Sequence, residues 1–99
     1  MINLSGRMVV RPEAREAFIT GVKAVTPPSL RDPGCRTYSC YEDVNEPNSF
    51  LFYEEWDSEA ELDAHLAAPH TQAFIKVVGA SVAKPATITV HTILESHTK

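Results

Sequence analysis

Two histidines and one carboxylate stand close together along the chain, next to its most aromatic segment. Glu54 lies within the run Phe50–Trp56, and His65 and His70 follow shortly after it. Imidazole titrates near neutral pH, so either histidine is able to accept a proton from an acidic organic substrate. An ionised carboxylate between aromatic side chains is costly unless it is paired, which indicates for Glu54 either a raised pKa or a hydrogen bond that orients a neighbouring histidine. These three residues are therefore the candidate catalytic groups.

The same three residues also have structural interpretations. A lone histidine on an apolar helix face is often a packing residue, and Glu54 could form a structural ion pair or a hydrogen bond to the backbone. A metal site is disfavoured, because His65 and His70 are five residues apart across Pro69, lack the spacing of a helical zinc pair and have no apparent third ligand. No glycine-rich phosphate loop or nucleophile elbow is present, so we expect neither a metal nor a cofactor.

Large apolar side chains near the histidines indicate the wall of a substrate pocket. Alternation along the strand places Phe52 and Trp56 on the same face as Glu54, and Trp56 ends that strand at a position that often lines a cleft. Helical spacing brings further apolar residues beside His65 and His70. The predicted substrate-binding residues are Trp56, Phe52, Phe74 and Leu62.

Hydrophobic periodicity and turn residues divide the chain into six elements. Alternating apolar residues indicate strands, while Pro12, the Ser58–Glu61 capping box and Pro69 mark helix starts. Pro27 and Pro28 are expected to end the first helix. The predicted order is a strand over 2–10, a helix over 12–26, strands over 35–43 and 49–56, a helix from 58 that restarts at 69 and ends before 85, and a strand over 88–94.

This order is that of the ferredoxin-like α+β fold, in which helices cover one side of a four-stranded antiparallel sheet. A composition of 43% hydrophobic and 22% charged residues fits one globular domain over residues 1–99. Both faces of the predicted sheet carry apolar residues, with Phe50 and Trp56 on one face and Leu51 and Tyr53 on the other. Because a solvated face should be polar, we predict that the second face is buried against a second copy in a two-fold homodimer.

The charge and hydropathy of the chain argue against nucleic-acid and membrane partners. The net charge is −4, and the Lys and Arg residues are scattered, so there is no basic stripe to neutralise phosphates. No apolar run approaches the roughly 20 residues of a membrane span, and the N-terminus lacks a signal-peptide pattern, so a cytoplasmic protein is expected. Cys35 and Cys40 point to opposite faces of a strand and are expected to be reduced packing residues.

Three segments together resemble the antibiotic biosynthesis monooxygenase family. They are Pro33-Gly34-Cys35 before the second strand, Phe52–Trp56 at the end of the third, and Ala64–His70 in the second helix. The pattern is most similar to the quinol monooxygenase branch and, around Pro69-His70, to the related enzyme that processes an autoinducer signal molecule. The resemblance implies a dimeric α/β barrel, formed when two sheets pack together, and oxidation of small aromatic substrates by dioxygen without a metal or organic cofactor.

The resemblance also implies a particular chemistry. An acidic phenol or anthrone loses a proton and its electron-rich anion itself reduces dioxygen, so the protein supplies a base, a dry pocket and orientation. The positions that correspond to the Asn, Trp and His set of heme-degrading relatives hold Gly6, His65 and Ile75, which disfavours heme cleavage. A tryptophan of the actinorhodin-pathway oxygenase corresponds to Trp56. The polar residues that act with it in that enzyme correspond to Phe52 and Leu62 here, so only Trp56 carries over.

We therefore expect a cofactor-independent monooxygenase of quinol-like or polyphenolic substrates, with His65 or His70 as the base and Glu54 as the orienting carboxylate. Two alternatives stay open from the sequence: a proton-transfer isomerase that uses the same base without oxygen, and a non-catalytic binder of small aromatic molecules. Turnover under strict anaerobiosis with no gain in product mass would indicate the isomerase. A change in Trp56 fluorescence on ligand binding, without any chemistry, would indicate the binder.

Overall fold

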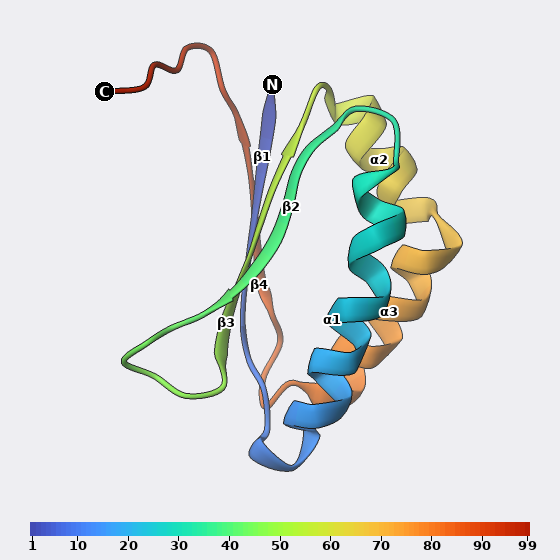
Figure 1. Cartoon of the computed structure of the whole chain (residues 1–99), viewed down its shortest axis with the longest axis vertical. Coiled ribbons are helices and arrows are strands. Elements are labelled where there is room, and N and C mark those ends of the chain that lie inside the picture. Colours follow the sequence, from blue (N-terminus) through green and yellow to red (C-terminus); the bar gives the residue numbers. More distant parts are fainter.

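A four-stranded antiparallel sheet carries all the helices on one of its faces (Figure 1). The computed structural model describes residues 1–99. Its elements are β1 (Ile2–Val9), the 3-10 helix η1 (Pro12–Ala14), α1 (Arg15–Leu30), β2 (Cys35–Glu42), β3 (Ser49–Trp56), α2 (Glu59–Ala67), α3 (Pro69–Ser81) and β4 (Thr87–Thr92). The strand order β2-β3-β1-β4 confirms the predicted ferredoxin-like α+β fold. The sheet of the single chain is open, and the dimeric barrel stays a prediction.

The second helical segment consists of two helices because a proline interrupts it. Ser58 caps α2 by accepting a hydrogen bond at 3.3 Å from the backbone N–H three residues later, as the capping-box pattern predicts. Ala68 is extended (φ −66°, ψ 147°), because Pro69 disfavours a helical residue before it, and Pro69 begins α3. His65 consequently lies in the last turn of α2 and His70 in the first turn of α3, on the two sides of one corner.

The first helix is longer than predicted. α1 continues through Pro27–Pro28 to Leu30 instead of ending at Thr26. The carbonyls that lose their N–H partners to the prolines belong to Lys23 and Ala24, which are exposed, so water is able to replace those hydrogen bonds. Val25 and Ser29, on the other side of the same turns, are buried. The added turn carries the chain to Asp32 in the α1–β2 connection. Even at this length, no helix combines the length and apolar character that a membrane span requires.

The hydrophobic core lies between the sheet and the helices. In β3, the side chains of Phe50, Phe52 and Trp56 face the helices, and none of them is more than 6% exposed. Phe18 of α1 packs on Phe50 with ring centroids 4.8 Å apart, which ties α1 to the centre of the sheet. The buried hydrophobic residues are Ile2, Leu4, Met8, Val10, Phe18, Val25, Tyr38, Phe50, Phe52, Trp56, Leu62 and Phe74.

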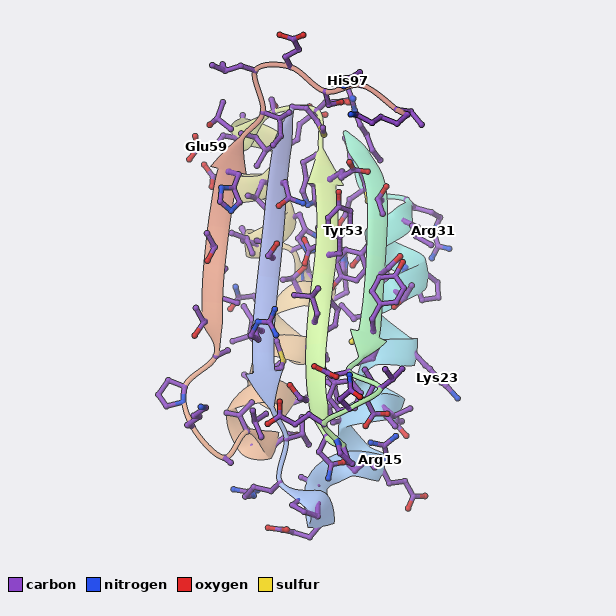
Figure 2. The ribbon with its side chains drawn as sticks, turned by 90° about the vertical axis from the view of Figure 1, so that its left-hand side faces the viewer. Arg15, Lys23, Arg31, Tyr53, Glu59 and His97 are labelled. Carbon is purple, nitrogen blue, oxygen red and sulfur yellow. The ribbon has the colours of Figure 1, made fainter.

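The other face of the sheet is open to solvent in the single chain (Figure 2). Strand pairing places Tyr53 beside Ser5 and Leu51 beside Arg7, so apolar and polar side chains alternate across this face. Tyr53 is 36% exposed and Tyr41 is 57% exposed. The face is therefore more mixed than the substantially apolar face that the sequence predicted, and its burial against a second copy stays a prediction.

β4 forms an edge of the sheet that the helices do not cover. Ile88 and Val90 pair with inward-facing positions of β1 and thus face the helical side, yet they are 54% and 46% exposed. The strand ends at Thr92, so Leu94, which was predicted to belong to it, lies outside it and is 95% exposed. The helical side of the sheet is consequently accessible along β4.

Candidate active site

An apolar cavity of about 250 Å³ lies between the sheet and the α2–α3 corner. Most of its lining is hydrophobic, and the partly exposed side chains of Leu66, Ile75 and Ile88 mark its mouth beside β4. The lining residues are Leu4, Gly6, Met8, Tyr38, Phe52, Glu54, His65, Leu66, Thr71, Phe74, Ile75, Val78, Ala86 and Ile88. A concave, apolar site with a few polar groups is the usual form of a small-molecule site, and the volume of this one is just below the usual range, so it suits a small guest.

Polar groups meet at one corner of this cavity. Glu54 of β3 and His65 of α2 are only 6% and 3% exposed, and Thr71 and Tyr38 line the cavity beside them. The indole N–H of Trp56 donates to Oε1 of Glu54 at 3.0 Å, and the same oxygen is 3.9 Å from Nε2 of His65. Burial raises the pKa of Glu54 to about 7, although the hydrogen bond from Trp56 opposes the rise. Glu54 is therefore able to hold or release a proton near neutral pH.

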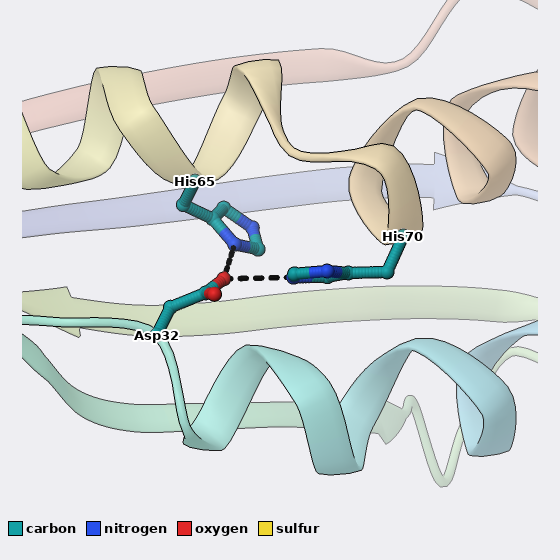
Figure 3. Close-up of side chains that lie close together, drawn as sticks. All are labelled: Asp32, His65 and His70. Carbon is teal, nitrogen blue, oxygen red and sulfur yellow. Dashed lines mark hydrogen bonds and ion pairs between the residues drawn. The ribbon is translucent and has the colours of Figure 1, made fainter.

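A second carboxylate, Asp32, holds both histidines (Figure 3). Its Oδ2 lies 2.8 Å from Nδ1 of His65 and 2.7 Å from Nε2 of His70. Asp32 comes from the end of α1 and meets the α2–α3 corner from the opposite side. Partial burial acts to raise the pKa of Asp32, but the hydrogen bonds from His65 and His70 outweigh burial and lower it. Asp32 is thus an ionised carboxylate that binds two imidazoles.

The contacts of Asp32 determine the hydrogen positions on His65. An ionised carboxylate only accepts hydrogen bonds, so we assign a hydrogen to each nitrogen that faces it, Nδ1 of His65 and Nε2 of His70. In the neutral ring of His65, Nε2 then carries a lone pair at the cavity corner. Burial lowers the pKa of His65, and the hydrogen bond to Asp32 opposes this effect, so the neutral ring is favoured at neutral pH. A carboxylate that orients an imidazole in this way is the usual support of a general base.

The predicted pocket residues divide into two pairs. Phe52 and Phe74 lie at the cavity wall with ring centroids 5.3 Å apart, and their contact with a substrate stays a prediction. Trp56 and Leu62, at 0% and 2% exposure, lie in the core and not at the cavity wall. The indole of Trp56 packs on the ring of His65, with centroids 4.5 Å apart, and gives its N–H to the neighbouring carboxylate. Trp56 therefore holds His65 and Glu54 in place from the core side of the cavity.

His70 lies outside the cavity. It lines a groove of about 210 Å³ between α1 and α3, and Phe74 separates this groove from the cavity because it lines both. The side chain of His70 is 23% exposed, against 2% for that of His65. Of the two candidate bases, only His65 reaches the cavity, and His70 is connected to it through Asp32.

Sequence reasoning missed Asp32 and Thr71 as site residues. It gave Glu54 the role of orienting a histidine, whereas Oε1 of Glu54 is too far from His65, at 3.9 Å, for a hydrogen bond. The partners of Asp32 lie 33 and 38 positions later in the chain, and their meeting depends on how α1 packs beside α3. An acidic residue directly before Pro33-Gly34 is the one signal that the sequence offered.

Asp32, His65 and His70 also form a donor set that transition metals accept. Their ligand atoms lie within 4.8 Å of one another, and Asp32 supplies the third ligand that the sequence did not reveal. The two nitrogen–oxygen separations of 2.7 and 2.8 Å are hydrogen-bond lengths, and both end on the same carboxylate oxygen. We therefore interpret the three side chains as a hydrogen-bonded cluster, which we call the Asp32 cluster.

Known proteins resemble this chain in sequence. The family model described as "Antibiotic biosynthesis monooxygenase" matches residues 1–77. The protein sll1783 of Synechocystis sp. is 40% identical over 97 residues, which cover 98% of this chain and 66% of that protein, so the chain spans about two thirds of this relative. The protein named "Probable quinol monooxygenase YgiN" of Escherichia coli is 29% identical over 83% of this chain and 88% of that protein.

Solved structures resemble the chain over nearly its whole length. The structure of Rv0793 from Mycobacterium tuberculosis superposes with a TM-score of 0.91 at 28% sequence identity and covers 98% of both chains. The fold, the family match over residues 1–77 and these relatives agree with one another. The chain belongs to the antibiotic biosynthesis monooxygenase family.

Proposed function

We propose that this protein is a cofactor-independent monooxygenase that oxidises a small quinol-like or polyphenolic aromatic substrate with dioxygen. The observation that carries the proposal is the 2.8 Å contact of Asp32 with Nδ1 of His65, from which we assign an unprotonated Nε2 at the polar corner of an otherwise apolar cavity, 3.4 Å from Oγ1 of Thr71. Membership of the family and the relative named as a quinol monooxygenase support the class of reaction and substrate.

The first step is the removal of a proton from a phenolic hydroxyl. The substrate O–H bond breaks, its proton goes to Nε2 of His65, and the electron pair stays on the aromatic anion. Asp32 accepts the hydrogen bond from Nδ1 and stabilises the imidazolium that forms. The apolar walls hold water away from the anion, which keeps its electrons available for dioxygen.

In the second step the anion reduces dioxygen. A carbon–oxygen bond forms while the carbon–hydrogen bond at the same ring carbon and the oxygen–oxygen bond break, so that one oxygen atom stays in the product and the other leaves as water with two protons that come from the substrate. For an aromatic diol, the diol and dioxygen give a hydroxyquinone and water, and the substrate is the only reductant. Glu54, with a pKa of about 7, lies beside His65 and returns a proton to the departing oxygen.

The shape of the cavity orients a planar substrate. The rings of Phe52 and Phe74 are tilted by 54° to each other and offer aromatic surfaces for stacking or edge contacts. Gly6 keeps the sheet side of the cavity open, since a Cβ at this position would lie 3.1 Å from Cδ1 of Ile88. The substrate ring then lies beside Gly6 with its hydroxyl towards His65.

The active form in this proposal is a homodimer that pairs through the open sheet face. Tyr41 and Leu51 are cross-strand neighbours on that face, and Tyr53 follows in β3, so three large side chains lie among the polar ones without a helix above them. A two-fold axis would place this face against its own copy. Sedimentation should give the mass of two chains, and a monomer at micromolar concentration would contradict this part of the proposal.

The proposal is tested by oxygen uptake with a panel of naphthoquinols and anthrones. Because such substrates also react with oxygen unaided, each rate is compared with buffer alone. We expect uptake above buffer with the wild-type protein and its loss in His65→Gln, with His97→Gln, at an exposed position beyond the end of β4, as the matched histidine control. Uptake equal to buffer across the panel would reject the proposal.

The same base also permits a reaction that does not use oxygen. The Asp32–His65 pair is sufficient for moving a proton within a substrate, so the panel should be repeated under anaerobic conditions. Turnover that continues without oxygen and without a gain in product mass would establish a proton-transfer isomerase. Saturable binding with no turnover in either atmosphere would leave a binder of aromatic molecules.

A further inference from the structure

One carboxylate oxygen serves two imidazoles in the Asp32 cluster. Both hydrogen bonds, 2.8 Å to Nδ1 of His65 and 2.7 Å to Nε2 of His70, end on Oδ2, as Figure 3 shows. In the proposed reaction His65, Asp32 and Glu54 each have a role, whereas His70 has none. His70 does not line the cavity, so it does not touch the substrate, but it competes with His65 for the same oxygen.

We propose that His70 is a positioning residue that sets how strongly Asp32 holds His65, and thereby how readily His65 accepts a proton from the substrate. This inference rests on the proposed function, because it assigns a regulator to the base of that reaction. His70 lines the groove between α1 and α3, and Phe74 separates this groove from the cavity. Through His70, a change in the groove would therefore affect the base in the cavity.

The physical argument is competition for one acceptor. Two N–H groups that donate to one oxygen share its negative charge, so each bond is weaker than it would be alone. A positive charge on His70 adds to this effect, because it lies close to His65, with ring centroids 5.8 Å apart, and disfavours a second cation there. Both effects act in the same direction and make His65 a weaker base.

The difference in exposure makes this coupling a route from solvent to the base. The side chain of His70 is 23% exposed, while that of His65 is 2% exposed. A change in the hydrogen bonding of His70 therefore reaches His65 through Asp32, without any opening of the cavity.

Other ionisable groups near His65 do not contact Oδ2. From β2, burial raises the pKa of Tyr38 and raises that of Cys35 to about 11, so both stay neutral at physiological pH. Glu54 of β3, with a pKa of about 7, faces Nε2 of His65 on the cavity side. Asp32, whose pKa is lowered, stays ionised at physiological pH. His70 is thus the group that acts on Nδ1 of His65 by way of Asp32.

The test compares two substitutions at His70. His70→Phe keeps a ring of similar volume but removes the N–H groups and the charge, whereas His70→Gln keeps a donor and removes the charge. Nitrogen-detected NMR titration of the His65 imidazole gives its pKa in each protein. We expect the pKa of His65 to be highest in His70→Phe, intermediate in His70→Gln and lowest in the wild type, and the rising limb of the kcat/KM pH profile to move upward by the same amounts.

The two readouts separate this inference from the proposed function. If the His65 titration moves as expected but no oxygen uptake occurs with any substrate, the oxygenase assignment fails and the coupling stands. If uptake depends on His65 but its titration is the same in all three proteins, the coupling is wrong and the oxygenase stands. Near-ultraviolet circular dichroism of Trp56 verifies the folding of each variant. Saturable Co²⁺ binding that requires all three side chains would identify a metal site and overturn the inference.

Discussion

The two ends of the helical layer each hold a carboxylate network, and the two networks differ in whether a hydrogen-bonding group is left without a partner. At the start of α1, Glu42 accepts two hydrogen bonds from the guanidinium of Arg15 and one from the backbone N–H of Asn48. The Arg15 hydrogen bond, foremost, and the contact with Asn48 lower the pKa of Glu42 to about 2. This network lies near solvent, and both of its charged groups are fully paired.

The Asp32 cluster is built from similar parts with a different result. Asp32 accepts two hydrogen bonds where Glu42 accepts three, and one of its partners, His65, is buried and keeps Nε2 without a hydrogen at the cavity corner. Glu54 beside it has its pKa raised to about 7 by burial, where Glu42 has its pKa lowered by pairing. A carboxylate network is suited to chemistry where it is buried and leaves one proton acceptor facing a cavity.

The largest expected effect comes from Asp32→Asn. An amide in place of the carboxylate removes the charge that stabilises the imidazolium and permits the wrong tautomer of His65, so we expect kcat for oxygen uptake to fall by about 10²–10⁴-fold. The matched variant is Glu42→Gln, which also turns a paired carboxylate into an amide and should keep kcat within about twofold. Equal losses in the two variants would show that the networks do not differ in function.

The next effect concerns Glu54 and pH. A carboxyl whose pKa is about 7 in the folded protein, against an ordinary 4.5, binds its proton more tightly when folded, so it stabilises the fold below pH 4.5 and loses this contribution as the pH rises through 7. The rise corresponds to about 3 kcal/mol. The free energy of unfolding of Glu54→Gln, relative to the wild type, should therefore increase by about 3 kcal/mol between pH 4.5 and pH 8. Urea unfolding at both values checks this, and parallel pH curves would contradict it.

A smaller effect is expected for Trp56→Phe. The substitution removes the indole N–H that donates to Glu54 and leaves the buried carboxylate without that partner. We expect the pKa of Glu54 to rise further and the variant to lose about 1–3 kcal/mol more stability at pH 8 than at pH 5, because only the ionised carboxylate needs the donor. The loss of ring contacts is the same at both pH values and cancels in the comparison. An equal loss at both pH values would remove Trp56 from the electrostatics of the site.

The smallest effect is expected at the exposed network. Arg15→Gln breaks the pairing with Glu42, yet both side chains are in contact with solvent, which replaces the lost hydrogen bonds. We expect a slight decrease in the thermal midpoint and no change in oxygen uptake. The decrease should be larger at low salt than at high salt, because salt screens the Arg15–Glu42 pair of the wild type. A large loss of activity would mean that the two networks are coupled through α1.

Much of the fold follows from short-range patterns in the sequence. Period-two alternation placed β3, the capping box at Ser58 placed α2, and Pro69 placed the α2–α3 corner, because each pattern acts on neighbouring residues. The predicted end of α1 was wrong, since the two carbonyls that the prolines leave without an N–H partner are on the exposed side of the helix, while Ser29 in its last turn is buried. Local rules of this kind predict where an element begins. They are less reliable for where an element ends, because packing with distant residues is able to extend it.

The site was predictable only in part for the same reason. His65 and Glu54 were identified because residue type and strand alternation mark them as polar groups in apolar surroundings. Asp32 was not, because its role depends on a contact between segments that are far apart in the sequence. Trp56 was placed at the cavity wall from its position at a strand end, but its large ring fills the space beneath His65 instead.

The central claim is that His65 removes the proton that starts a reaction with dioxygen. The most direct test is a single reaction of the wild-type protein and of His65→Gln with a naphthoquinol under isotopically heavy dioxygen, followed by mass spectrometry of the product. We predict one heavy oxygen atom in the product of the wild-type protein, at a rate above buffer, and only the buffer rate with His65→Gln. Equal incorporation by the two proteins, or none above buffer, would contradict the account.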